Sequence, residues 1–76
     1  DTPDVWYWLA EVEGLSGNIA EVHLARAEYY VRLGALTQAQ RHLYLALPLF
    51  EQNMQAKSRV QLRINDIEKM KQEQQF

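Results

Sequence analysis

The chain has 76 residues, enough for one small domain, and 47% of them are hydrophobic, which suffices for a core. Its net charge of −2 shows no basic excess and argues against a nucleic-acid partner. The absence of cysteine excludes disulfides and thiolate sites, and no apolar run approaches the roughly 18–20 residues that span a membrane.

A first helix is predicted near residues 3–15. Thr2 can cap it, Pro3 suits the first helical position, and Asp4 complements the positive end of the helix dipole. The chain starts at Asp1 rather than Met, and we therefore expect it to be part of a longer protein.

A second helix is predicted near residues 19–33. Gly17 lies in the turn before it, and Asn18 can cap it with Glu21 as the partner in a capping box. Gly34 is expected to end the helix in the left-handed conformation, which glycine adopts without steric cost.

A third helix is predicted near residues 36–51, because apolar residues recur there at steps of three and four. Pro48 is expected to kink or end it, since proline lacks a backbone donor and clashes with the preceding turn. A fourth helix is predicted near residues 54–72. Its polar tail, residues 69–75, is expected to fray.

These signals predict an all-α domain over residues 1–76, built as a right-handed antiparallel stack of four helices. No run alternates apolar and polar residues with β-branched enrichment, and no hairpin dipeptide occurs, so strands are not expected.

Small and aromatic residues follow one pattern through the middle of the chain, Ala27-x2-Tyr30-x3-Gly34-x4-Ala39-x3-Leu43-x2-Ala46-Leu47. In this pattern the chain resembles the tetratricopeptide repeat (TPR), a helix–turn–helix unit of about 34 residues. The resemblance covers residues 19–50 and, through Trp6-x2-Leu9-Ala10, part of the first helix. It implies a TPR-like superhelix fragment whose units stack on one another and present a binding surface. Whether helices pair as 1+2 and 3+4 or as 2+3 stays open.

A narrower resemblance rests on residues 22–30, on Gly34, Gln38-Ala39 and Leu43-x2-Ala46-Leu47, and on Arg59-x3-Arg63-Ile64-x2-Ile67-Glu68. These segments look like the C-terminal TPR tail of bacterial periplasmic zinc metalloproteases of the β-barrel assembly-enhancing type. The resemblance implies a periplasmic parent protease that cleaves or escorts outer-membrane proteins. It also implies that the tail contacts protein partners or the parent's own protease domain. The chain lacks an HExxH motif, so no zinc ligand or catalytic residue is carried over.

Helical spacing assigns two sets of residues. Those expected to pack between helices are Trp6, Leu9, Ala10, Ala27, Tyr30, Gly34, Ala39, Leu43 and Ala46. Those off the core face of the second helix form a candidate partner-binding stripe of Glu21, Leu24, Glu28, Val31 and Arg32. We expect Leu24→Ala together with Glu28→Ala to weaken partner binding and leave the fold intact. A plain solvent-facing role for the stripe stays equally open.

The aromatic run at residues 6–8 cannot be buried on one side. Trp6 and Trp8 lie about 200° apart on a helix, so Trp6 is expected to fill the first interhelical gap while Trp8 or Tyr7 points elsewhere. We expect that side chain to pack on an upstream repeat, and the exposed ends of the stack also allow self-association.

No catalytic group, metal site or cofactor is expected within this chain. The two histidines, His23 and His42, are 19 residues apart on different predicted helices, and surface or interhelical hydrogen bonding is expected of them. Two functions stay open. The first is a protein–protein interaction module at the C-terminal end of a zinc-dependent protease whose active site lies outside it. The second is a purely structural helical segment that stabilises its parent and has no ligand of its own.

Overall fold

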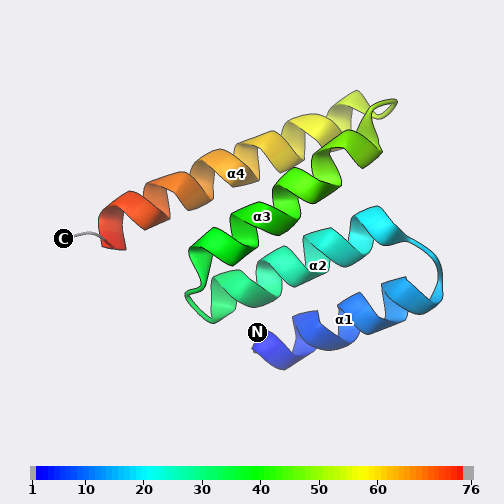
Figure 1. Ribbon diagram of the computed structural model, residues 1–76, viewed down its shortest axis with the longest axis horizontal. Helices are drawn as coiled ribbons and strands as arrows, with labels where there is room; N and C mark the ends of the chain where they lie inside the picture. Colours follow the sequence, from blue (N-terminus) through cyan, green and yellow to red (C-terminus); the bar gives the residue numbers. More distant parts are fainter. Residues whose placement is uncertain (1, 75–76) are drawn as a thin grey trace.

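The computed structural model describes residues 2–74, which form an antiparallel stack of helices (Figure 1). The elements in chain order are α1 (Pro3–Leu15), α2 (Ile19–Arg32), α3 (Leu36–Ala46), a 3-10 turn η1 (Leu47–Phe50) and α4 (Met54–Gln74). Each helix packs on the next one along the chain. The described residues contain no strand, and the predicted all-α stack of four helices is confirmed.

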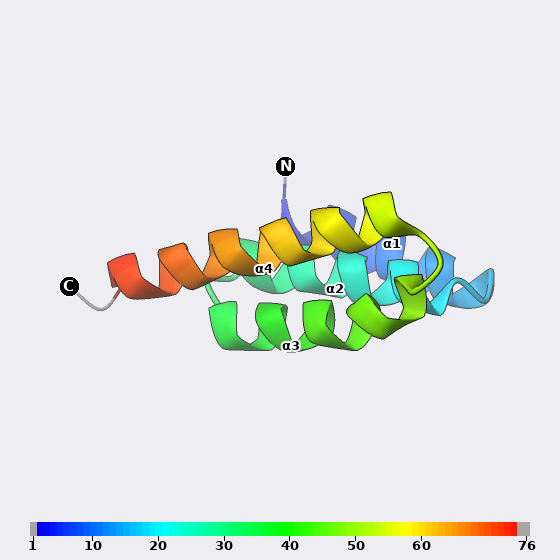
Figure 2. The same cartoon turned by 90° about the horizontal axis from the view of Figure 1, so that it is seen from above.

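The stack is not flat. Seen from above, α3 and α4 lie on opposite sides of the level of α2 (Figure 2). Apolar side chains of α4 therefore pack on both α2 and α3, and the molecule measures 40 × 28 × 17 Å.

Two glycines make the turns that separate the first three helices. Gly17 and Gly34 have φ angles of 79° and 77°, in the left-handed region where a side chain is strained. At the second turn the amide of Ala35 donates to the carbonyl of Tyr30 at 2.9 Å, which closes the end of α2. The left-handed stop predicted at Gly34 is confirmed.

The predicted capping box at the start of α2 is wrong. Asn18 is the N-cap residue, but its side chain makes no hydrogen bond to the helix. Its amide Nδ2 donates instead to Oε2 of Glu13 at 2.9 Å, across the turn from α1. A cap that was not predicted lies at α4, where Oδ1 of Asn53 accepts from the amide of Ala56 at 3.0 Å.

The third helix is shorter than predicted and the fourth is longer. The α-helical part of α3 ends at Ala46, and the chain continues as the 3-10 turn that contains Pro48, so the predicted end at this proline is confirmed. The tail of residues 69–75, expected to fray, is helical as far as Gln74. Residue 75 lies outside the described part of the chain.

The buried amide of Gln40 on α3 contacts the C-terminal half of α4. Its Nε2 donates to the carbonyl of Ile64 and to Oε1 of Glu68, both at 3.2 Å, and its Oε1 accepts from Nζ of Lys71 at 3.0 Å. Met70 packs against the core on the same stretch. Hydrogen bonding of a buried amide holds the polar end of α4 on the stack.

The core consists of two clusters. The main cluster joins α2, α3 and α4 and contains Ala27, Leu36, Ala39, Leu43, Val60, Ile64 and Ile67. The second cluster joins α1 to α2 and contains only Ala10, Val22 and Ala25, with Trp6 packed against it. Helix α1 therefore contributes a single buried residue, Ala10, to the core.

Candidate functional site

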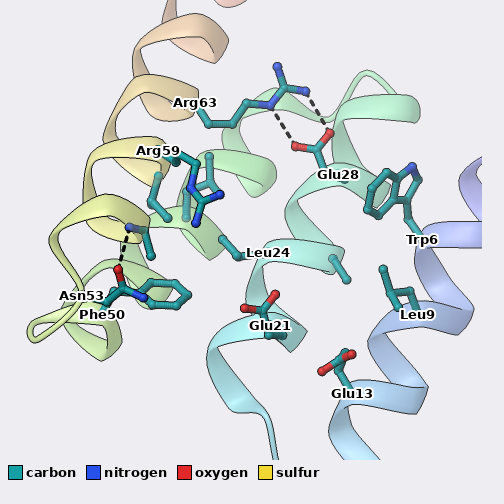
Figure 3. A pocket seen from close by; sticks show the side chains of 14 residues that line it. Trp6, Leu9, Glu13, Glu21, Leu24, Glu28, Phe50, Asn53, Arg59 and Arg63 are labelled. Carbon is teal, nitrogen blue, oxygen red and sulfur yellow. Dashed lines mark hydrogen bonds and ion pairs between the residues drawn. The ribbon is translucent and has the colours of Figure 1, made fainter.

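A groove of about 550 Å³ lies between α1 and α4, with α2 as its floor (Figure 3). Its residues come from every helix of the stack. They are Trp6, Leu9, Glu13, Glu21, Leu24, Ala25, Glu28, Leu43, Phe50, Asn53, Ala56, Arg59, Val60 and Arg63. The groove forms because α4 folds back over α2 and α3 while α1 lies along the other side of α2.

The middle of the groove is apolar. Leu24 lies on its floor, and Trp6 and Leu9 of α1 face Phe50 from the other side. Leu9, predicted to pack between helices, is 40% exposed and contributes to the wall of the groove. Apolar side chains that remain open to solvent in a concave site favour the binding of another molecule.

One end of the groove is closed by an ion pair between α2 and α4. Nε of Arg63 donates to Oε2 of Glu28 at 2.8 Å, and Nη2 of Arg63 donates to Oε1 at 2.9 Å (Figure 3). Arg32, one turn along α2, also donates to Glu28. Burial by itself would raise the pKa of Glu28, but the hydrogen bonds and charges of Arg63 and Arg32 outweigh it and hold this pKa below its usual value.

Three further charged side chains face the groove. Glu13 and Glu21 lie together at the end away from the Glu28–Arg63 pair, and Arg59 projects from α4 (Figure 3). Neither Glu21 nor Arg59 makes an ion pair with another residue of the described chain. The groove therefore presents an acidic end and a separate cationic group on either side of an apolar middle.

The predicted partner-binding stripe is divided by the structure. Glu21, Leu24 and Glu28 line the groove, whereas Val31 packs against the main cluster and Arg32 lies outside the lining. The guanidinium of Arg32 sits over the ring of Trp6, 5.1 Å from its centroid, and also binds Glu28. Because Glu28 holds α4 to α2, replacing it by alanine would loosen the stack. In contrast to the expectation from the sequence alone, Glu28→Ala is therefore expected to lower the stability of the fold as well.

Most of the predicted packing residues are buried. Ala10, Ala27, Ala39, Leu43 and Ala46 have almost no exposed surface, and Trp6 and Tyr30 are half-buried. Gly34 is exposed in its turn and acts through its backbone angle alone.

The two histidines meet on the side of the stack where α2 and α3 touch. Their Nδ1 atoms are 3.1 Å apart, and the ring of Tyr30 stacks on His42 with centroids 5.5 Å apart. The predicted interhelical hydrogen bond is confirmed, and it requires one ring to carry a proton on Nδ1 and the other to accept. Burial lowers the pKa of His23 and His42, and the nearby charge of Arg26 lowers both further.

The described residues hold no cluster of three or more histidine, cysteine, aspartate or glutamate side chains placed to bind a metal ion. Over residues 2–74, no helix has the length and apolar character that crossing a membrane requires. Trp6 packs toward α2 as expected, whereas both Tyr7 and Trp8 are exposed, and not just one of them.

The contribution of α4 to the groove was not predicted from the sequence. The spacing of four between Arg59 and Arg63 places both on one face of a helix. That spacing, set beside the acidic Glu21 and Glu28 on α2, could have suggested that the two faces meet.

Comparison with models of protein families, with curated proteins and with solved structures finds no match for this chain. The likeness to TPR proteins therefore rests on the residue pattern, and the fold rests on the four helices themselves.

Proposed function

We propose that this chain is a protein–protein interaction module that binds a segment of a partner in the groove over α2. The observation that carries the proposal is the combination of an open apolar middle with unpaired charges at defined positions, Glu21 on one side and Arg59 on the other. A segment that fits has an apolar face, a basic side chain near Glu21 and an acidic side chain near Arg59.

We further propose that the module belongs to the C-terminal part of a periplasmic zinc-dependent protease, with the active site outside this segment. The support is the resemblance of residues 22–47 and 59–68 to the TPR tail of such enzymes. On this proposal the groove binds either the parent's own protease domain or a protein of outer-membrane assembly.

The purely structural alternative is favoured by a different observation. Two members of the predicted stripe, Glu28 and Arg32, are engaged in ion pairs within the chain, and Val31 contributes to its core. If the other side chains of the groove also serve only contacts within the protein, the chain stabilises its parent and has no ligand.

The experiment is a titration of the isotopically labelled chain with a purified zinc protease domain of the β-barrel assembly-enhancing type, followed by NMR. The groove variants are Arg59→Glu and Glu21→Lys, because both side chains are exposed and neither supports the fold. Each is expected to weaken binding by about 1–2 kcal/mol, or roughly ten-fold. Lys57→Glu, on the same helix and outside the groove lining, is the matched control.

Folded groove variants that bind as well as the unmodified chain would place the docking surface elsewhere. Absence of binding to the protease domain and to outer-membrane assembly proteins would favour the structural alternative.

A further inference from the structure

Helix α1 has two apolar faces, and only one of them is covered. Ala10 is buried against α2, with Trp6 half-buried beside it. On the opposite side, the free face of α1 consists of Val5, Trp8, Val12 and Leu15, which are 56%, 64%, 56% and 91% exposed. Their steps of three, four and three residues place them in one line along the helix, which is the spacing that one helix uses to pack on another.

The two ends of the stack differ in how much apolar surface they expose. Helix α4, at the other end, exposes only Met54 and Leu62 among its large apolar residues, and they lie eight residues apart. A polar outer face is what ends a helical stack in solution, whereas a continuous apolar stripe marks a surface that another element covers. The stack is therefore closed at α4 and open at α1, the first ribbon of Figure 1.

Charge indicates what kind of element covers the free face. Helix α1 carries Asp4, Glu11 and Glu13 and contains no lysine or arginine. Asp4 and Glu11 are seven residues apart along one edge of the stripe, and neither forms an ion pair with any residue between 2 and 74. Positions beside an apolar helical seam select partners by charge.

A second copy of this chain fits the free face poorly. If two α1 helices packed antiparallel through this stripe, the two-fold axis would pass near Ala10. Glu11 of each copy would then face Glu11 of the other, and like charges in these positions oppose pairing. A helix with basic side chains in the corresponding positions meets Asp4 and Glu11 with opposite charge.

We propose that the free face of α1 binds an amphipathic helix of a partner protein that carries lysine or arginine beside its apolar seam. The stripe from Val5 to Leu15 extends for about 15 Å at 1.5 Å per residue, so the partner contributes about three helical turns. This surface lies on the side of α1 away from α2, and it is distinct from the groove and independent of the function proposed for it.

The test uses two synthetic helical peptides with the same leucine seam, one with lysine and one with glutamate at the positions beside it. The chain has two tryptophans, so a Trp6→Phe background leaves Trp8 as the only one and its emission reports on the free face. The lysine peptide is expected to give a saturable shift of Trp8 emission to shorter wavelength. The glutamate peptide is expected to bind at least ten-fold more weakly.

Substitutions in the chain then assign the contact. Val12→Ser, at an exposed position, is expected to weaken binding of the lysine peptide at least ten-fold. The matched control Leu62→Ser, at an exposed position of α4, is expected to leave that binding unchanged. Glu11→Lys leaves one negative and one positive side chain beside the stripe and is expected to abolish the preference between the two peptides. The groove variant Arg59→Glu is expected to bind the lysine peptide normally, which separates this surface from the groove.

Each other outcome overturns the proposal. Equal binding of both peptides would show that charge does not select the partner. No binding of either peptide would show that the free face of α1 does not bind a helix. A concentration-dependent shift of Trp8 without peptide, together with dimers in sedimentation that Val12→Ser abolishes, would identify a second copy as the occupant. Stronger shifts with anionic lipid vesicles than with the lysine peptide would identify a membrane surface instead.

Discussion

The ion pair between Glu28 and Arg63 connects α2 to α4, and its removal tests how the groove is held together. The two hydrogen bonds are 2.8 and 2.9 Å long, and the side chains of Glu28 and Arg63 are 18% and 30% exposed. Exposed ion pairs contribute about 0.2–1 kcal/mol, and breaking a buried pair costs about 3–5 kcal/mol. This half-buried two-pronged pair lies between those limits. We expect Glu28→Ala to lower the free energy of unfolding by about 1–2 kcal/mol.

Urea unfolding followed by far-UV circular dichroism at pH 7 measures this effect. A double-mutant cycle with Arg63→Ala isolates the pair, and a coupling energy of about 1 kcal/mol is expected. Glu21→Ala is the matched control, because it removes the same side chain from an exposed position of α2. It is expected to change stability by less than about 0.5 kcal/mol. A coupling energy near zero would refute the structural role of the pair.

Acid provides a second measurement on the same pair. The pKa of Glu28 is lower in the folded chain than in the unfolded chain, so the carboxylate contributes stability above its unfolded pKa of about 4.3. That contribution is lost as the pH falls further, through the lower folded pKa. The stability difference between the unmodified chain and Glu28→Ala should therefore shrink only below about pH 4.3.

Three further predictions concern the core and the histidines. Ala39, fully buried in the main cluster, is expected to tolerate no larger side chain: Ala39→Leu should cost about 1–3 kcal/mol in thermal unfolding, and Gln38→Leu on the exposed side should not. Folding lowers the pKa of His23 and of His42, so the stability that their neutral forms contribute is fully present above about pH 6.5 and falls as the pH drops below that value. In the His23→Gln, His42→Gln double variant, this decrease of the free energy of unfolding with falling pH should be lost. Zinc near neutral pH should leave the unfolding midpoint unchanged, since two imidazoles alone are an incomplete ligand set, and a stoichiometric micromolar site would contradict this.

The helices could be predicted from the sequence because their ends are marked by residues with few alternatives. Gly17 and Gly34 take a backbone angle that other residues avoid, and Pro48 cannot continue an α-helix. The cap at Asn18 could not be predicted with the same success. Its amide can bond to its own helix or to a neighbour, and the position of Glu13 across the turn decides between them.

The groove could be predicted only in part, for a physical reason. Helical spacing shows that Glu21, Leu24 and Glu28 share one face of α2, but it does not show what lies opposite. The partner of Glu28 is Arg63, 35 residues later, and this pairing depends on how α4 folds back over the stack. A side chain predicted to bind a partner therefore serves the fold, while Arg59, which local spacing on α2 could not reveal, faces the open groove.

The separate core cluster between α1 and α2 leads to a last prediction, on the local stability of α1. The small cluster of Ala10, Val22 and Ala25 is separate from the main cluster, so α1 can open while α2, α3 and α4 remain packed. Native-state hydrogen exchange should show the amides of α1 exchanging through an opening of lower free energy than those of α2 and α3. Uniform protection across all four helices would show instead that the chain unfolds as one unit.

Helix α1 forms one wall of the groove and also carries the free face of Val5, Trp8, Val12 and Leu15, so a ligand on either surface should raise the hydrogen-exchange protection of α1. A ligand on one surface would then favour binding at the other, because the first ligand has already ordered α1 and the second does not have to.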